Sequence, residues 1–328
     1  MNGRLLIYGA TGYTGQMVAQ AAKDAGLDIV LAGRDAGKLA KLALQLDASY
    51  RAFAVDDTPA LHAALGDCAA VLNCAGPFAA TAKPIIEACL ATGAHYLDIT
   101  AEFNVYALAE SLSDAAAKAG VMLLPGVGWD VVPSDALAVR TVAQVANPQR
   151  LRIALQVAGS MSRGSAISAG EIIAVGLLVR QDGEIVTRPD AQSAEFNFGE
   201  GYVECFPLSF GDLVTAWRST GVPNIEMFVH VTGEAFPQGD LSTLPDGPTA
   251  QERDENRAKV VVEVLGADGS LASAMIETVN GYSYTPLAAA EAARRVLAGE
   301  HHSGFQTPAT VFGPDFATSI PGTQIIDL

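Results

Sequence analysis

The chain has 328 residues, of which 50% are hydrophobic and 17% are charged. This composition excludes an intrinsically disordered chain, and the length predicts two domains at about 100–200 residues each. The 20 basic and 36 acidic residues give a formal net charge of −16, so we expect no binding to nucleic acid, which requires a basic surface. We also expect a cytoplasmic protein without a membrane span, because long apolar runs and a signal-peptide pattern are lacking.

The first part of the chain alternates short apolar runs with helical patterns. The runs predicted as strands are 4–8, 28–32, 50–54, 69–73, 95–99 and 121–124. Helical spacing of apolar residues predicts helices over 15–25, 35–46, 58–65, 80–92 and 103–119. Continuous apolar strands alternating with helices predict an α/β fold, with a doubly wound parallel sheet of the Rossmann type in residues 1–130.

The second part has longer strands with more alternation, predicted at 151–157, 225–232, 259–265 and 271–279. A Gly-containing turn at 266–269 joins the last two as a hairpin. Ser168 and Glu171 have capping-box spacing and predict a helix start, and a final helix is predicted over 286–297. Residues 234–251 are predicted to form a loop. We therefore expect a second, α+β domain with an antiparallel sheet over 131–280, for substrate binding and dimerisation, and a C-terminal helix and tail over 281–328 that packs back toward the first domain.

A glycine-rich turn follows the first predicted strand and opens the first helix. Small residues in a G-x-x-G-x-x-G pattern let the backbone approach a pyrophosphate, which binds to the helix N-terminus. A turn of the same kind that binds no cofactor is the alternative. The cofactor-binding residues predicted here are Gly9, Thr11, Gly12, Tyr13, Thr14 and Gly15.

The end of the second predicted strand indicates which dinucleotide is bound. Arg34 stands where an NAD-binding unit has an acidic residue, and Lys38 follows one helical turn later. An arginine at this position accommodates a 2′-phosphate, so we expect NADP as the cofactor. A solvent-facing cation is the alternative for Arg34, and Asp35 is expected to cap the next helix.

Two further segments follow predicted strands at the same edge of the sheet. Asp56 lies where an adenine ring would pass, with capping of the next helix as the alternative. After the fourth strand, a loop with Gly and Pro is expected to pack over the cofactor. Its predicted cofactor-binding residues are Asn73, Ala75, Gly76 and Pro77.

These motifs, taken in order, make the sequence similar to the saccharopine dehydrogenase-like NADP-binding oxidoreductases, a family that includes trans-acting enoyl reductases. The resemblance implies a Rossmann domain, a second domain with an antiparallel sheet, and a cleft between them, but it fixes no substrate. The sequence departs from the family's usual residues at Ala101, Trp129 and Val279–Asn280. The segments that carry the resemblance are 9–15, 32–34, 73–78, 95–102, 125–130, 133–135, 281–285 and 304–309.

Candidate catalytic residues lie at the carboxyl ends of the fifth and sixth strands. Asp98 and Glu102 follow the fifth strand as possible proton-transfer groups, with helix capping and dipole stabilisation as the alternative. Asp130 follows the sixth strand in a Gly-rich loop and is the leading candidate for a substrate or nicotinamide contact. Ser134 and Asp135 are expected to cap the helix after Pro133.

The second domain offers further polar residues. Arg163, with Ser162 and Ser165 beside it, would suit a carboxylate, although a solvent-facing arginine is the more common outcome at such a position. Tyr282 is a candidate proton donor, and ordinary aromatic packing is the alternative. No tyrosine is followed four positions later by lysine, which excludes the usual short-chain dehydrogenase pair.

The cysteines and histidines indicate no further chemistry. Four cysteines form no C-x-x-C pair, and five histidines form no metal-binding motif, so we expect reduced thiols and no metal.

The sequence therefore predicts an NADP(H)-dependent oxidoreductase that reduces a C=N, C=O or C=C bond of a small molecule in an interdomain cleft, with homodimerisation through the second domain. Two alternatives remain open at this stage. One is a non-catalytic NADP-binding sensor or scaffold, and the other is a C–N bond-forming synthase that uses the cofactor transiently.

Overall fold

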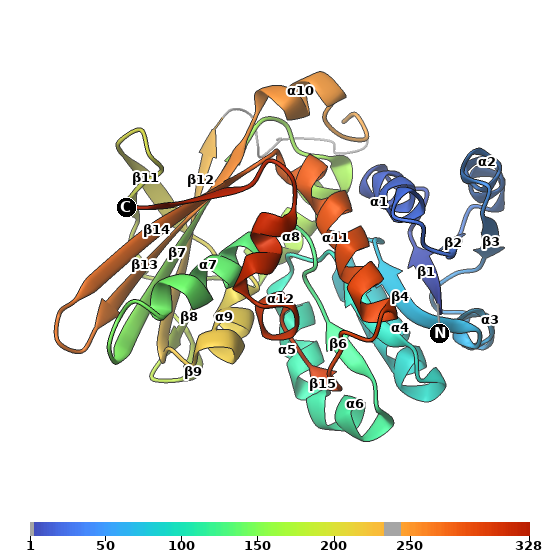
Figure 1. Ribbon diagram of the computed structural model, residues 1–328, viewed down its shortest axis with the longest axis horizontal. Coiled ribbons are helices and arrows are strands. Elements are labelled where there is room, and N and C mark those ends of the chain that lie inside the picture. The colour runs from blue at the N-terminus through green and yellow to red at the C-terminus, as the bar shows by residue number, and fades with distance from the viewer. Residues whose placement is uncertain (1–2, 233–243) are drawn as a thin grey trace. The chain divides into compact units, whose positions relative to one another are not determined.

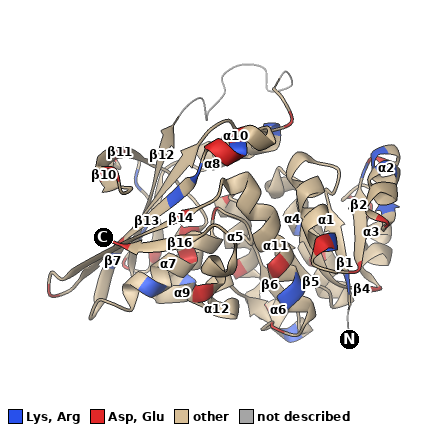
Figure 2. Ribbon diagram, turned by 45° about the horizontal axis from the view of Figure 1, so that its top comes forward, with Lys and Arg blue, Asp and Glu red and all other residues tan. Residues whose placement is uncertain are grey.

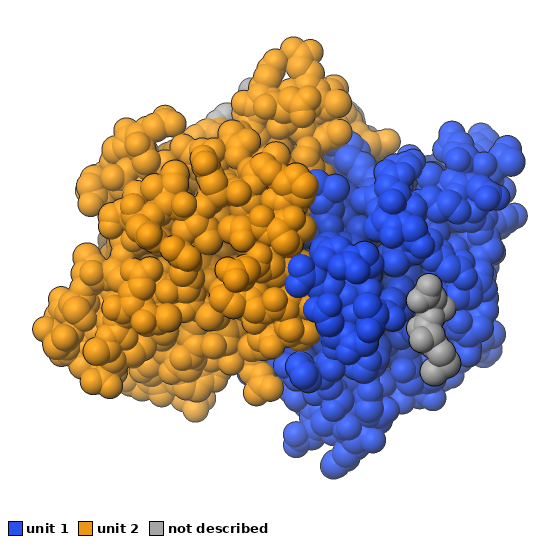
Figure 3. Space-filling model, viewed as in Figure 1, with its two compact units in different colours: residues 1–100, 104–129, 285–306 blue, residues 101–103, 130–284, 307–328 orange. Residues whose placement is uncertain are grey.

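The computed structural model describes residues 3–232 and 244–328, so much of the predicted loop at 234–251 lies outside the described residues. The chain forms two compact units (Figure 3). Unit 1 contains the chain up to Thr100 together with 104–129 and 285–306, and unit 2 contains 101–103, 130–284 and 307–328. The predicted C-terminal segment 281–328 is thus divided between the two units.

Unit 1 is built on a seven-stranded sheet with the order β15-β6-β5-β4-β1-β2-β3, in which every pair is parallel. Continuous apolar runs such as those of β1 and β2 are buried, as expected for a sheet covered on both faces. The strands are β1 (Arg4–Tyr8), β2 (Ile29–Gly33), β3 (Ser49–Ala52), β4 (Cys68–Asn73), β5 (His95–Asp98), β6 (Met122–Leu124) and β15 (Gly304–Phe305). The sheet confirms the predicted Rossmann class and adds β15, which is too short to show a pattern in the sequence.

The helices of unit 1 connect these strands (Figure 1). They are α1 (Tyr13–Asp24), α2 (Ala36–Leu46), α3 (Thr58–Leu65), α4 (Phe78–Thr92), α5 (Phe103–Ser111), α6 (Ser113–Ala119) and most of α11 (Gly281–Leu297). The single helix predicted over 103–119 is two, because the chain breaks at Leu112. Asp35 caps α2 as predicted, with its Oδ1 accepting the Lys38 N–H at 2.9 Å.

Unit 2 contains a nine-stranded sheet whose main path is β10-β11-β12-β7-β13-β14-β16, with β8 paired to β12 and β9 paired to β8. The pairs are antiparallel except that β12 runs parallel to β7, so the predicted antiparallel sheet is a mixed one. The hairpin of β13 and β14 at 266–269 is confirmed. The strands are β7 (Pro148–Ala158), β8 (Leu178–Gln181), β9 (Glu184–Thr187), β10 (Ala194–Asn197), β11 (Tyr202–Pro207), β12 (Asn224–Thr232), β13 (Ala258–Gly266), β14 (Leu271–Thr278) and β16 (Gln324–Asp327).

The helices of unit 2 correct two sequence predictions. The capping box expected at Ser168 is wrong, because the helix starts earlier and its cap is Ser162, whose hydroxyl accepts the Ser165 N–H at 3.1 Å. The predicted loop ends early, because Thr249 begins α10 with a capping box of its own. The helices are α7 (Val132–Val142), α8 (Arg163–Ala174), α9 (Asp212–Thr220), α10 (Ala250–Glu255), α12 (Pro308–Phe312) and the 3₁₀ helix η2 (Pro314–Ser319).

The C-terminal residues complete both units rather than forming a separate tail. In unit 1, β15 pairs with β6 and extends the parallel sheet. In unit 2, α12 and η2 pack on α7, and β16 pairs with β14 at the sheet edge. The physical reason is that each unit leaves an open sheet edge that a returning segment can pair with.

The described helices include none with both the length and the apolar content needed to cross a bilayer.

Candidate functional site

At two positions of the glycine turn after β1, contacts within the chain leave no room for a side chain. Gly9 has a φ of +82°, and a Cβ there would lie 2.8 Å from the Cβ of Ala75 in the loop after β4. At Gly15, a Cβ would collide with the carbonyl oxygen of Gly9. These two glycines let the turn fold tightly against both α1 and the neighbouring loop.

Gly12 differs from both, because nothing in the described part of the chain requires a glycine there. Its φ of −72° is open to any residue, it is exposed, and a Cβ would meet only the Gly9 carbonyl oxygen, at 3.4 Å. Gly12 is the N-cap of α1, and no side chain caps that helix. The absence of a side chain at Gly12 therefore leaves space beside the N-terminal amides of α1, which is where a pyrophosphate binds in such turns.

The loop after β4 is held in shape by Asn73. The Asn73 side chain is fully buried; its Oδ1 accepts the Ala75 N–H, and its Nδ2 donates to Thr81 Oγ1, each at 3.0 Å. Thr81 in turn donates to the Ala75 carbonyl at 2.7 Å. Asn73 therefore positions Ala75 against the glycine turn, which fixes one wall of the predicted cofactor site.

Arg34 and Asp56 gather near Tyr8 at the carboxyl edge of β1, β2 and β3. Burial raises the pKa of the Tyr8 phenol, the nearby Arg34 charge lowers it, and the nearby Asp56 charge raises it. Arg34 and Lys38 are both exposed, and α2 shows basic positions in Figure 2. Asp56 does not cap the next helix, because Asp57 does so through the Ala60 N–H at 3.1 Å.

Asp98 ties together the loops that follow β5 and β6. Its carboxylate is fully buried and accepts the Tyr96 hydroxyl at 2.7 Å, the Thr100 N–H at 3.0 Å and the Gly126 N–H at 2.8 Å. The three donors engage both carboxylate oxygens. This arrangement supports a structural role for Asp98 and makes it a poor proton donor.

Asp130 and Tyr282, which are far apart in the sequence, come close together in unit 2. Asp130 is half-buried, and desolvation of its carboxyl group raises its pKa to about 6. Burial also raises the pKa of the Tyr282 phenol, and the nearby Asp130 charge adds to that increase. The Tyr282 hydroxyl accepts the Ser162 N–H and donates to Ser165 Oγ, each at 2.8 Å. Tyr282 thus belongs to a polar cluster at the start of α8, and the Asp130 charge lies near enough to act on its phenol.

The same helix holds Glu102. The Ser168 hydroxyl donates to Glu102 Oε1 at 2.7 Å, and both side chains are buried. Arg163 points elsewhere, because its guanidinium donates to the Leu244 carbonyl at 2.7 Å and lies 3.1 Å from Asp246. From the sequence, Ser162 and Ser165 were expected only as neighbours of Arg163, and Ser168 was expected at the helix start. Their spacing of three residues, which puts them on one helix face, was the available signal.

Ser134 and Asp135 are not the caps predicted for α7. The Ser134 hydroxyl donates to Asp212 Oδ1 of α9 at 2.7 Å, and Asp135 Oδ2 accepts the Ala309 N–H at 2.9 Å. Both carboxyl groups are fully buried, and Asp135 Oδ1 and Asp212 Oδ2 have no hydrogen-bond partner among the described residues. Burial raises the pKa of Asp135 to about 6 and that of Asp212 well above its usual range.

We expect these buried carboxyl groups to lower stability as the pH rises. The pKa of Asp135 is about 6 when folded against 3.8 for an exposed group, so the folded state binds the extra proton and loses stability as the pH rises from 3.8 through about 6. The substitution Asp135→Asn keeps an acceptor for the Ala309 N–H and introduces a side chain that cannot ionise. The melting temperature of this variant relative to the native protein should therefore rise between pH 4 and pH 8, as measured by thermal unfolding. An equal difference at every pH would contradict this assignment.

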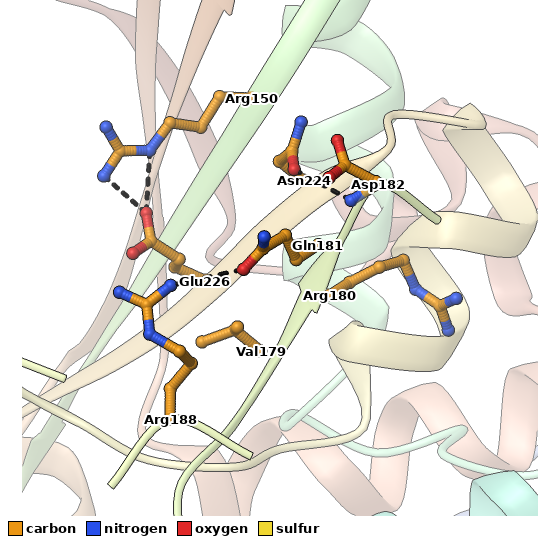
Figure 4. Close-up of a pocket in the computed structure, with 8 residues that line it drawn as sticks. All are labelled: Arg150, Val179, Arg180, Gln181, Asp182, Arg188, Asn224 and Glu226. Carbon is orange, nitrogen blue, oxygen red and sulfur yellow. Dashed lines mark hydrogen bonds and ion pairs between the residues drawn. The ribbon is translucent and has the colours of Figure 1, made fainter. Parts of the chain in front are cut away.

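A pocket of about 420 Å³ lies on the sheet of unit 2, away from the residues predicted from the sequence (Figure 4). Its polar groups satisfy one another: Arg150 Nε donates to Glu226 at 2.7 Å, and the Asp182 N–H donates to Asn224 at 3.0 Å. Arg180 donates to the carbonyl groups of Leu213 and Gly183. We assign no ligand to this pocket.

The sheet order, the glycine turn and the open space at Gly12 define unit 1 as a dinucleotide-binding domain of the Rossmann type. Residues 5–124 match the family model described as saccharopine dehydrogenase NADP binding domain. These residues are therefore similar to that family of NADP-binding domains, and the resemblance drawn from the sequence motifs is confirmed over this part of the chain.

Several proteins are similar to 40% of the chain. A trans-acting enoyl reductase of Mycobacterium leprae is 30% identical over 139 residues, which is 40% of this chain and 33% of that protein. A human saccharopine dehydrogenase-like oxidoreductase is 29% identical over 151 residues, or 40% of this chain and 35% of that protein. A lipid droplet localized protein of Caenorhabditis elegans is 27% identical over 145 residues, which is 40% of this chain and 34% of that protein. The chain thus spans about a third of the length of these relatives.

The fold extends the similarity beyond that part. The apo structure of saccharopine dehydrogenase (L-Glu forming) from Saccharomyces cerevisiae matches 99% of this chain and 100% of that one, with a TM-score of 0.66 and 14% identity. At this identity the match shows a shared fold. It confirms the predicted pairing of a Rossmann unit with a second unit that carries a mostly antiparallel sheet.

Proposed function

We propose that the protein is an NADP(H)-dependent oxidoreductase that reduces a C=N, C=O or C=C bond of a small molecule. The observation that carries this proposal is Gly12, the one glycine of the turn that the fold itself does not require. Space beside the α1 N-terminus, in a domain of an NADP-binding family, fits the pyrophosphate of that cofactor.

Different residues of unit 1 bind different parts of the cofactor. Gly9, Gly12 and Gly15 let the backbone approach the pyrophosphate, with Thr11, Tyr13 and Thr14 in the same turn. The loop of Asn73, Ala75, Gly76 and Pro77 packs along the cofactor, Arg34 and Lys38 bind the 2′-phosphate, and Asp56 borders the adenine. When bound, NADPH supplies the hydride; the protein positions the substrate and handles protons.

Arg34→Ala should weaken NADPH binding selectively. A charge-assisted bond to the 2′-phosphate contributes about 1.5–3 kcal/mol, so the dissociation constant for NADPH should rise about tenfold or more while that for NADH stays nearly the same. Fluorescence titration of both cofactors measures this. Equal weakening of both, or of neither, would remove Arg34 from the specificity site; Lys41→Ala on α2 is the control for a general loss of positive charge.

Unit 2 supplies the residues that we propose for the substrate. Asp130, with a pKa near 6, is mostly ionised at neutral pH and accepts a hydrogen bond from a polar group of the substrate. The Tyr282 phenol stays protonated and belongs to the same cluster. Asp98 and Glu102 take supporting roles through the bonds described above, Asp98 by holding the loop after β6 and Glu102 by anchoring α8.

Consumption of NADPH with a panel of aldehydes, imines and enones tests the reaction. We expect stoichiometric loss of NADPH absorbance with at least one of these classes. Cofactor binding without consumption would favour the alternative of a non-catalytic NADP sensor, and a product with a new C–N bond but no net NADPH consumption would favour a synthase. The proposal also includes a cytoplasmic location and a homodimer formed through unit 2. Gel filtration with light scattering tests the dimer by its molar mass.

A further inference from the structure

Three carboxyl groups lie near one another inside unit 2 with no cation to balance them. They belong to Asp130 just before α7, to Asp135 in α7 and to Asp212 at the start of α9. Asp135 and Asp212 are fully buried, and within the described part of the chain no positively charged side chain acts on any of the three. Three ionised carboxylates would repel one another at a high desolvation cost, which favours a proton on at least one of them.

The hydrogen bonds around the buried Ser134 hydroxyl indicate which carboxyl group holds that proton. Ser134 Oγ lies 2.7 Å from Asp212 Oδ1, 3.1 Å from the Val131 carbonyl oxygen and 3.3 Å from the Asp130 carbonyl oxygen. A serine hydroxyl has one proton, so it cannot serve all three oxygens. If Asp212 is ionised, Ser134 donates to it, as described above. If Asp212 is protonated, the bond reverses, and the serine proton becomes available to a carbonyl group of the preceding turn.

The three carboxyl groups differ in how well their surroundings support a charge. Asp135 Oδ2 accepts the Ala309 N–H at 2.9 Å, and two nearby hydroxyl groups also favour its ionised form. Asp130 is only half-buried. Asp212 bonds to the Ser134 hydroxyl through Oδ1, whereas its buried Oδ2 has no hydrogen-bond partner among the described residues. Asp212 is therefore the group least suited to ionise.

The other charged or titratable groups on the elements around α9 have partners elsewhere or are exposed. α9 packs against α7 and β12, and Arg180 of β8 donates to a carbonyl group of α9 at 2.8 Å. The remaining groups are Arg140 of α7, 3.6 Å from Asp327, Glu226 of β12, bonded to Arg150, His230 of β12, bonded to the Glu204 carbonyl, and Arg218 of α9, which is exposed. Among the described residues, the charges that act on Asp212 are those of Asp135 and Asp130, and both favour its neutral form.

We infer that Asp212 is a positioning residue for Asp130: it holds a proton at neutral pH, donates it to Ser134 Oγ and so leaves Asp130 free to ionise. This inference deepens the proposed function and rests on the substrate role given there to Asp130. A neutral Asp212 places no second negative charge near Asp130, which ionises with a pKa of about 6. The Ser134 hydroxyl is then available to the Asp130 carbonyl oxygen and helps to hold the backbone that carries the carboxylate.

Infrared spectroscopy of the whole 328-residue chain tests the proton on Asp212 without requiring catalysis. At pH 8, Asp130 and Asp135 are ionised, since their pKa values are about 6. We expect the native protein to show the C=O stretching band of a protonated carboxyl group at this pH, and Asp212→Asn to lose it. Asp254→Asn, which changes an exposed residue of α10, should keep the band. A native spectrum without the band, or an Asp212→Asn spectrum that retains it unchanged, would overturn the inference.

The pH–rate profile tests the effect on Asp130, with the substrate that gives turnover in the NADPH assay. Asp212→Ala removes the donor to Ser134 and should lower kcat/KM roughly tenfold for each folded molecule. Asp212→Asn keeps a donor and cannot ionise, so it should restore most of that loss and leave the limb near pH 6 in place. If Asp212 were ionised in the native protein, Asp212→Asn would remove a like charge and move the limb to lower pH, which would contradict the inference.

Melting temperature separates positioning from a purely structural role. A lower melting temperature in Asp212→Ala with full kcat/KM for each folded molecule would overturn the positioning role while leaving the reductase proposal intact. If the native protein binds NADPH and reduces no member of the panel, the proposed function and the positioning role both fall. The infrared band still decides, in that case, whether Asp212 holds a proton.

Discussion

Gly12→Val is expected to abolish the binding of both NADPH and NADH while the protein stays folded. A Cβ at this position would meet only the Gly9 carbonyl oxygen at 3.4 Å, and the valine methyl groups would occupy space beside the α1 N-terminus. Exclusion of the pyrophosphate removes an interaction common to both cofactors, so affinity should fall by roughly 100-fold or more, or ~2.7 kcal/mol. The backbone is already in an ordinary conformation, so the cost in stability should be about 1 kcal/mol or less.

Gly15→Ala is the matched comparison for this variant. A Cβ there collides with the Gly9 carbonyl oxygen, so the turn must distort and the melting temperature should drop clearly. Cofactor titration together with circular dichroism on both variants separates loss of the ligand's space from loss of the fold. A folded Gly12→Val protein with unchanged NADPH affinity would rule out the proposed pyrophosphate site.

Asp130→Asn should leave NADPH binding within about twofold and lower kcat/KM by roughly 100-fold or more. In the proposed function the carboxylate orients the substrate through its charge, and asparagine keeps the shape without that charge. Loss of the ionisable group should also remove the limb of the pH–rate profile near pH 6, where the pKa of Asp130 lies. In the native protein we expect kcat/KM to rise with pH through that region, because the ionised form is the active one.

Asp254→Asn serves as the control, since Asp254 is exposed on α10. It should match the native protein in kcat/KM, cofactor affinity and melting temperature. If Asp130→Asn instead lowers only the melting temperature, with full activity for each folded molecule, then Asp130 fastens its loop and another group must orient the substrate.

Local patterns in the sequence were sufficient to predict the fold of the first unit. The apolar runs of β1, β2 and β4 are continuous because both faces of a parallel sheet are covered, and the glycine turn sits where a strand passes directly into a helix. The Asp35 cap likewise depends only on residues three apart. These features rest on short-range geometry, and the sequence expresses it directly.

Features that depend on contacts between distant segments could not be predicted from the sequence. The parallel pairing of β7 with β12, the addition of β15 to the first sheet and the start of α8 at Ser162 follow from which strands and helices meet, and no local period encodes that choice. The prediction of a capping box at Ser168 failed for the same reason, since its hydroxyl is used by Glu102 of another segment.

The sequence by itself determined the class of the first unit, and it predicted NADP-binding residues along the strand ends, because each lies within a few residues of the strand or turn that defines it. Only the tertiary structure decided the rest of the site. It brought Tyr282 into hydrogen bonds with Ser162 and Ser165 at the start of α8, with the Asp130 charge near Tyr282, and it engaged Asp98 with three donors. Hydrogen bonding and desolvation act through space, so the role of a polar side chain depends on partners that the chain brings to it only when folded.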